Sequence, residues 1–143
     1  MTADSASLIL HGSCVALNGN GLLILGSSGA GKSTLALALM AMGAQLVADD
    51  RVVVARDGDA LIACAPAALS GMVEARGIGL LGATPLPQAR LHLVVDLDQT
   101  EPDRLPPRRE ISLLACRLPL VLGKSLPHLS IGLAQYLRGG RRD

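Results

Sequence analysis

The residues with the clearest chemical potential form one run, Gly26 to Ser33, which reads GSSGAGKS. This run fits the pattern G-x-x-x-x-G-K-[ST], in which glycines let the backbone curl and turn successive N–H groups toward phosphate oxygens. Lys32 would place a positive charge on the outer phosphates, and the Ser33 hydroxyl is a natural ligand of Mg²⁺. The run therefore predicts a phosphate cradle, or P-loop, that binds ATP or a similar polyphosphate.

The segments on either side of this run have the character that a phosphate cradle requires. Residues 22–25 are a short apolar run typical of a buried strand, whereas residues 32–42 lack Gly and Pro and are rich in strong helix formers. A helix that starts at the cradle presents its N-terminal N–H groups to the anion. A glycine-rich turn that binds nothing is the alternative, and this context disfavours it. We assign binding of the nucleotide to Gly26, Ser27, Ser28, Gly29, Ala30, Gly31, Lys32, Ser33 and Thr34.

Acidic residues that follow apolar runs are the next candidates, because P-loop enzymes need a carboxylate near the metal. Asp49 and Asp50 follow residues 46–48, and Asp96 follows residues 91–95. Adjacent residues at a strand end point in opposite directions, so one of the paired acids would face the metal and the other a substrate hydroxyl. Asp96 is a competing candidate for the acid that holds Mg²⁺. For the Asp49–Asp50 pair, the alternative interpretation is a solvated turn. The residues alone leave this choice open.

Three further charged or titratable residues are weaker candidates. His11 lies among apolar residues in an extended segment, where a structural histidine is the more common case. Glu74 and Arg76 lie two residues apart in a glycine-flanked stretch, so both side chains would share one face of an extended chain. A surface ion pair that contributes little is an equally good interpretation of these two charges.

The remaining pattern predicts an α/β P-loop domain with a mixed, partly antiparallel sheet around a central helix. The helix at 32–42 is apolar on nearly every side, which predicts that a second layer, such as another subunit, covers the side away from the sheet. Residues 69–84 are expected to be irregular, and residues 96–110 to form an exposed loop. Strands are expected at 7–18, 22–25, 46–48, 52–55, 61–65, 91–95, 111–114 and 118–122, and a last helix is expected to open at Pro127.

Composition narrows the class of protein. The 143 residues predict one domain over 1–143, and half of them are apolar although Phe and Trp are absent. A net charge of +1 argues against a nucleic-acid or membrane-surface binder. Three scattered cysteines predict reduced thiols in a cytoplasmic protein, and no apolar run is long enough to span a bilayer.

Together these motifs resemble the catalytic domain of HPr kinase/phosphorylase, which acts on a serine of the phosphocarrier HPr. The resemblance rests on five features in family order: His11, the GSSGAGKS loop, residues 47–52 (VADDRV), residues 73–79 (VEARGIG) and residues 103–105 (DRL). It covers roughly residues 8–125 and matches the short form, which lacks the N-terminal domain of the long form. The chain departs from the family where Thr34 replaces a glutamate and where residues 119–125 (PLVLGKS) lack arginines.

The resemblance implies a role for each matched residue. Asp49 would act as general base on the target serine, and as general acid in the reverse reaction that uses orthophosphate and yields pyrophosphate. His11 and Asp50 would support that carboxylate, and Arg76 and Arg104 would contact phosphate or organise the site. Ser33, Glu74 and Asp50 would hold Mg²⁺. The resemblance also implies an HPr-like partner and a homo-oligomer, usually a hexamer.

Two other functions remain open from the sequence. The same cradle would serve a kinase for a small metabolite, or a regulatory module that senses ATP or phosphate without catalysis. The retained Asp49–Asp50 pair favours catalysis, because a sensor needs no base. An Asn-Lys-x-Asp guanine-reading motif is absent, which argues against a GTPase.

Overall fold

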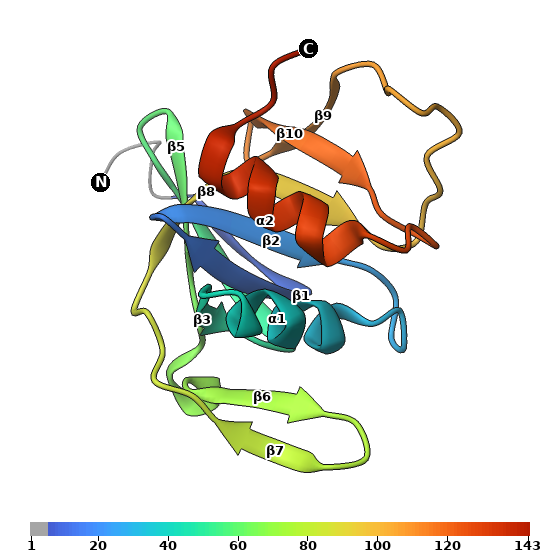
Figure 1. Cartoon of the computed structure of the whole chain (residues 1–143). Coiled ribbons are helices and arrows are strands. Elements are labelled where there is room, and N and C mark those ends of the chain that lie inside the picture. The colour runs from blue at the N-terminus through green and yellow to red at the C-terminus, as the bar shows by residue number, and fades with distance from the viewer. Residues whose placement is uncertain (1–5) are drawn as a thin grey trace.

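The computed structural model describes residues 6–143 and shows a twisted mixed sheet with two helices on one face (Figure 1). The first half of the chain forms β1 (Ser7–Leu17), β2 (Asn20–Leu25), α1 (Lys32–Ala41), β3 (Gln45–Ala48), β4 (Arg51–Asp57) and β5 (Ala60–Cys64). A short 3₁₀ turn, η2 (Ala67–Leu69), leads to β6 (Met72–Ala75) and β7 (Gly79–Gly82). The rest forms β8 (Ala89–Asp96), β9 (Arg109–Leu113), β10 (Cys116–Leu122) and α2 (Leu129–Gly139).

The main sheet has eight strands and both pairing directions. Its strands follow the order β2-β1-β4-β5-β8-β10-β9, and β3 pairs with β1 off this path. The cradle strand β2 runs parallel to β8, and β8 runs parallel to β10, whereas the other pairings are antiparallel. Because β2 also pairs with β8, the strands β2, β1, β4, β5 and β8 close a ring. The predicted mixed α/β sheet is therefore confirmed.

Alternating residues of the strands build two apolar cores. Leu22 and Ile24 of β2 face α1 and α2, whereas Leu23 faces the interior of the strand ring. Leu35 and Leu39 of α1 pack into the same core as Leu22 and Ile24. These two leucines lie about one helical turn apart, as expected for a helix that lies on a sheet. Both cores consist of Leu, Val, Ile and Ala side chains with two cysteines, as the composition predicted.

The prediction of irregular structure for residues 69–84 is wrong. This stretch contains the antiparallel hairpin β6–β7, which forms a separate two-stranded sheet beside α1 (Figure 1). Val73 and Ala75 of β6 are buried, and Val73 belongs to the core that contains α1. Gly77 and Gly79 adopt positive φ at the tip, so the glycines that suggested irregularity form the hairpin turn.

The hairpin also explains why α1 is apolar on nearly every side. The helix lies between the main sheet, α2 and β6, so elements of this same chain supply the second layer (Figure 1). The other expected strands and the exposed loop lie close to their predicted positions, and the last helix begins at Leu129 rather than Pro127. No helix within residues 6–143 is both long and apolar enough to cross a membrane.

Candidate phosphotransfer site

The phosphate cradle lies between the end of β2 and the first turn of α1. Gly29 and Gly31 adopt φ of 84° and 100°, which side chains with a Cβ atom rarely tolerate. The loop is closed by Ala30 N–H, which donates to Ser27 O at 3.0 Å, and α1 begins where Leu35 N–H donates to Gly31 O at 2.9 Å. The glycines at these positions therefore let the backbone form the curl that the sequence pattern predicted.

Lys32 is buried beneath this loop and is held by it. Its ammonium donates to Gly26 O at 2.8 Å and to Ser27 O at 2.9 Å. An ammonium group has three donors, so these two bonds leave one for a phosphate oxygen. The side chain is therefore fixed at the cradle before a ligand arrives.

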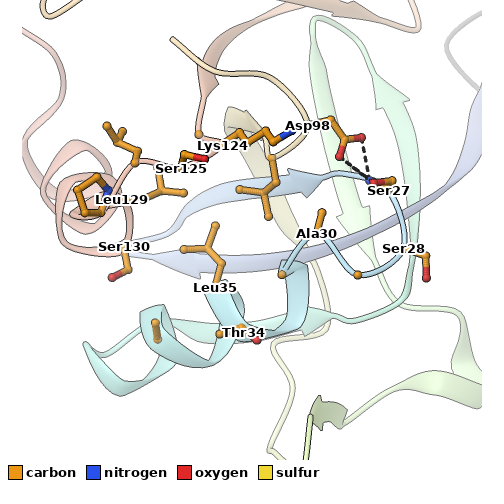
Figure 2. A pocket seen from close by; sticks show the side chains of 17 residues that line it. Ser27, Ser28, Ala30, Thr34, Leu35, Asp98, Lys124, Ser125, Leu129 and Ser130 are labelled. Carbon is orange, nitrogen blue, oxygen red and sulfur yellow. Dashed lines mark hydrogen bonds between the residues drawn. The ribbon is translucent and has the colours of Figure 1, made fainter.

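Asp98, which follows β8, caps the start of the cradle (Figure 2). Its carboxylate accepts hydrogen bonds from Ser27 N–H at 2.8 and 3.1 Å and from Ser27 Oγ at 2.9 Å. The backbone hydrogen bond from Ser27 is the largest cause that lowers the pKa of Asp98, followed by the bond from the Ser27 hydroxyl, and the charges of Lys32 and Lys124 add to this effect. Asp98 therefore stays ionised and anchors Ser27 of the loop to the segment that follows β8.

Asp49 lies buried beside the cradle, at the end of β3. One carboxylate oxygen accepts from Ser13 Oγ at 2.6 Å, and both oxygens lie within 2.9 Å of Ser33 Oγ. The same carboxylate accepts from the Glu74 backbone N–H at 3.0 Å, which ties β6 to the cradle. With a relative exposure of 7%, this acid faces the P-loop serine rather than an incoming molecule.

Asp50, unlike the buried Asp49, is exposed to solvent. Its φ of 71° turns the backbone after β3, and its side chain is 63% exposed. His11 Nε2 lies 3.3 Å from one oxygen of Asp50, and Arg51 Nε lies 3.9 Å from the other. A left-handed backbone at a non-glycine residue is costly, and such conformations concentrate at functional sites. The two adjacent acids therefore have different surroundings: Asp49 is buried beside Ser33, whereas Asp50 is exposed and pairs with His11.

Two cavities border the cradle on its two sides. The smaller, of about 330 Å³, is lined by His11, Asp50, Glu74 and Arg76 together with cradle residues. The larger, of about 860 Å³, extends from the cradle along α1 to residues 123–130 (Figure 2). Both cavities share part of the cradle, so a bound polyphosphate would be accessible from either side. The shared residues are Ser28, Gly29, Gly31 and Thr34.

Two candidate residues lie elsewhere. Asp96 accepts hydrogen bonds from Asp98 N–H at 2.8 Å and from Gln99 Nε2 at 2.6 Å, so it caps its own turn and lines neither cavity. Arg104 is exposed in the loop between β8 and β9, which stands away from α1 (Figure 1), and it also lines neither cavity. The structure therefore disfavours a metal role for Asp96 and does not bring Arg104 to the cradle of its own chain.

Sequence reasoning missed three residues of the site. Ser13 lies two residues after His11 on the same strand, and its polar side chain in an apolar run was a usable signal. Asp98 and Lys124 border the larger cavity, but Asp98 follows β8, which pairs with the distant β2, and Lys124 follows β10, which pairs with β8. Local sequence carried no signal for these two.

The donor set is compatible with Mg²⁺ bound together with phosphate. Among residues 6–143, no cluster of three or more His, Cys, Asp or Glu side chains offers a protein-only metal site. The Ser33 hydroxyl and the Asp49 carboxylate nevertheless lie within 2.9 Å of each other at the cradle, and Mg²⁺ typically takes one or two carboxylates with phosphate oxygens completing the shell. These residues fit an ion that arrives with a polyphosphate.

The fold and this arrangement of side chains define a P-loop domain, with a phosphate cradle, a lysine held at it and a pair of adjacent acids beside it. The family model described as HPr Serine kinase C-terminal domain matches residues 3–131. The chain therefore belongs to the HPr serine kinase C-terminal domain family, as the sequence resemblance predicted.

Individual relatives agree with this placement. An HPr kinase/phosphorylase from Aromatoleum aromaticum is 37% identical over 141 residues, which cover 85% of this chain and 45% of the relative. One from Limosilactobacillus reuteri is 43% identical over 102 residues, which cover 66% of this chain and 32% of the relative. The chain thus spans less than half the length of these curated relatives. A solved Hpr(Ser) kinase/phosphatase from Coxiella burnetii superposes with a TM-score of 0.78 at 25% identity, covering 92% of this chain and 94% of that one.

Proposed function

We propose that this domain transfers the γ-phosphoryl group of ATP to a serine hydroxyl of an HPr-like phosphocarrier protein. The observation that supports this most is the exposed Asp50–His11 pair, which opens into a cavity that shares the phosphate cradle. A base must reach the acceptor hydroxyl directly, so an exposed carboxylate beside the cradle suits proton transfer from an incoming substrate.

In this proposal the two adjacent acids have different roles. Asp50, oriented by His11, takes the proton of the serine hydroxyl, whereas buried Asp49 holds Ser33 and thereby the metal. This assignment exchanges the roles that family resemblance suggested for the two acids. The reason is access, because Asp49 is buried and both of its oxygens already accept hydrogen bonds.

The transfer exchanges one phosphorus–oxygen bond for another. The serine oxygen attacks the γ-phosphorus, the bond from this phosphorus to the bridging oxygen breaks, and ADP leaves while Asp50 receives the hydroxyl proton. Lys32 and the N–H groups of the cradle neutralise charge on the phosphates, which accounts for most of the catalysis in phosphoryl transfer. Ser33, Asp49 and Glu74 would hold Mg²⁺, which supplies further neutralisation of phosphate charge.

The same site would support the reverse reaction, in which the phosphoryl group is removed from the phosphocarrier. Orthophosphate held by the cradle attacks the phosphorus of phosphoserine, the serine oxygen leaves with the proton from Asp50, and pyrophosphate forms. Arg76 lines the same cavity and carries a positive charge suited to the phosphoserine. Arg104 has no role within one chain in this proposal.

A transfer assay tests the proposal directly. The protein is mixed with γ-labelled ATP, Mg²⁺ and an HPr-like phosphocarrier from the same host, and acid-stable label on serine is the expected product. Excess orthophosphate should then release the label as pyrophosphate. If ATP binds normally and no label reaches the phosphocarrier, the acceptor assignment is refuted and a small metabolite becomes the better candidate.

A further inference from the structure

Ser13 is a polar side chain in the middle of an apolar strand, and the transfer step described above gives it no role. It is completely buried, with a relative exposure of 0%. Burying a hydroxyl is costly unless the group has a hydrogen-bond partner. Ser13 Oγ donates to Asp49 Oδ1 at 2.6 Å, so its partner is the acid beside the phosphate cradle.

The strand β1 changes its pairing partner at this point. Residues 7–11 pair with β4 and residues 14–16 pair with β3, and the turn that joins β3 to β4 carries Asp49 and Asp50. Gly12 N–H donates to Asp50 O at 3.1 Å, which holds this turn against β1. The backbone therefore places both acids beside this part of β1 before any ligand binds.

Each of the two acids has its own partner on β1. His11 and Ser13 lie two residues apart, so their side chains share one face of the strand. His11 Nε2 lies 3.3 Å from Asp50, and Ser13 Oγ lies 2.6 Å from Asp49. Both side chains line the smaller cavity. The proposed base and the proposed metal-holding acid are thus contacted by neighbouring side chains of a single strand.

The hydrogen bond from Ser13 restricts the rotation of the Asp49 carboxylate. The last torsion of an aspartate side chain has broad minima, so the carboxylate turns unless its oxygens are held. Ser13 Oγ holds Oδ1, the Glu74 N–H holds Oδ2 at 3.0 Å, and Ser33 Oγ lies 2.8 and 2.9 Å from the two oxygens. Without the Ser13 hydroxyl, Oδ1 loses the donor that keeps it in place, and the carboxylate turns more freely beside Ser33.

We infer that Ser13 is a positioning residue for the metal, because it holds the Asp49 carboxylate toward Ser33, where Mg²⁺ would bind together with the phosphates of ATP. This inference rests on the proposed function, and it adds the group that orients the metal-holding acid. Ser13 itself touches neither ATP nor the acceptor. Groups that hydrogen-bond to a metal ligand fix its orientation, and their loss typically weakens metal binding by about 10–100-fold.

The test measures how strongly Mg²⁺ promotes the binding of ATP. Isothermal titration calorimetry gives the dissociation constant of ATP with excess Mg²⁺ and again with EDTA, and the ratio of the two constants reports the effect of the metal. Ser13→Ala removes the hydroxyl. Cys14→Ala is the matched control, since it also removes one heavy atom from a completely buried side chain of β1, but Cys14 belongs to the core inside the strand ring.

The expected result is selective for the metal. In Ser13→Ala the stabilisation of ATP binding by Mg²⁺ should fall by about tenfold, the lower end of the range for such partners, with less than about a twofold change in EDTA. Cys14→Ala should keep the ratio of the wild type. A role of Ser13 in folding alone would lower the unfolding midpoint in urea and leave the ratio unchanged.

Two results would overturn the inference. One is an equal ratio in Ser13→Ala and the wild type, whatever the stability of the variant. The other is a wild type that binds ATP equally well with Mg²⁺ and with EDTA, since the metal would then have no effect for Ser13 to support. A wild type that binds no ATP even with Mg²⁺ would overturn the proposed function itself and this inference with it, so the two failures are distinguishable.

Discussion

The two adjacent acids offer the sharpest test, because Asp49→Asn should destabilise the fold with no such loss in the neighbouring Asp50→Asn, which should instead lose phosphoryl transfer. Asp49 accepts hydrogen bonds from two hydroxyls and one backbone N–H in a buried position. In Asp49→Asn the amide retains one acceptor oxygen and places an NH₂ group toward a donor, such as the Glu74 N–H. A hydrogen bond to a charged group contributes about 1.5–3 kcal/mol. Neutralising a buried carboxylate recovers part of its desolvation cost, so we expect a loss of about 2 kcal/mol.

Asp50→Asn should leave the free energy of unfolding unchanged. The side chain is 63% exposed, and asparagine tolerates the left-handed backbone that this position adopts. Transfer should nevertheless fall by about 10²–10⁴-fold, the usual contribution of a general base, while ATP affinity stays the same.

The measurement is urea unfolding followed by far-UV circular dichroism, since the chain has no tryptophan for fluorescence. Transfer to the phosphocarrier and ATP binding are measured on the same preparations. An Asp50→Asn variant with wild-type transfer would refute the assignment of the base. Equal stability of Asp49→Asn and the wild type would refute the buried hydrogen-bond network as a structural element.

Three other predictions follow from single contacts. Lys32→Met should abolish binding of ATP and tripolyphosphate in calorimetry, because it removes the one ammonium fixed at the cradle; retained binding would contradict this role. Gly12→Ala should destabilise the fold by about 1–3 kcal/mol in urea, since its Cβ would lie 2.7 Å from the Ile24 carbonyl oxygen. Burial raises the pKa of the Cys14 thiol from 9.0 to about 12, so the folded chain keeps a proton that the unfolded chain releases. Stability should therefore fall as the pH rises from 9 toward 12, and Cys14→Ala should show a shallower decline.

The cradle and most of the strands were predictable because their signals are local. Residues 26–33 carry the whole phosphate-binding pattern in one continuous run, and the strand and helix around it are typical of their composition. The hairpin β6–β7 was not predictable in the same way. Its glycines suggested loop structure, and its two short strands are stabilised by long-range contacts: Val73 is buried in the core that contains α1, and the Glu74 N–H donates to Asp49.

In the candidate site, too, some features were predictable from local sequence and others depended on long-range packing. The sequence by itself determined that a P-loop is followed by a pair of acids, and that the chain resembles the HPr kinase family. Which acid is buried at the cradle depends on tertiary contacts, because Asp49 accepts hydrogen bonds from Ser13 of β1 and from the Glu74 N–H of β6. The convergence of Ser13, Asp98 and Lys124 on the cradle was decided by strand pairings between distant segments. Local composition specifies the chemistry of a loop, whereas only long-range packing brings separate loops together.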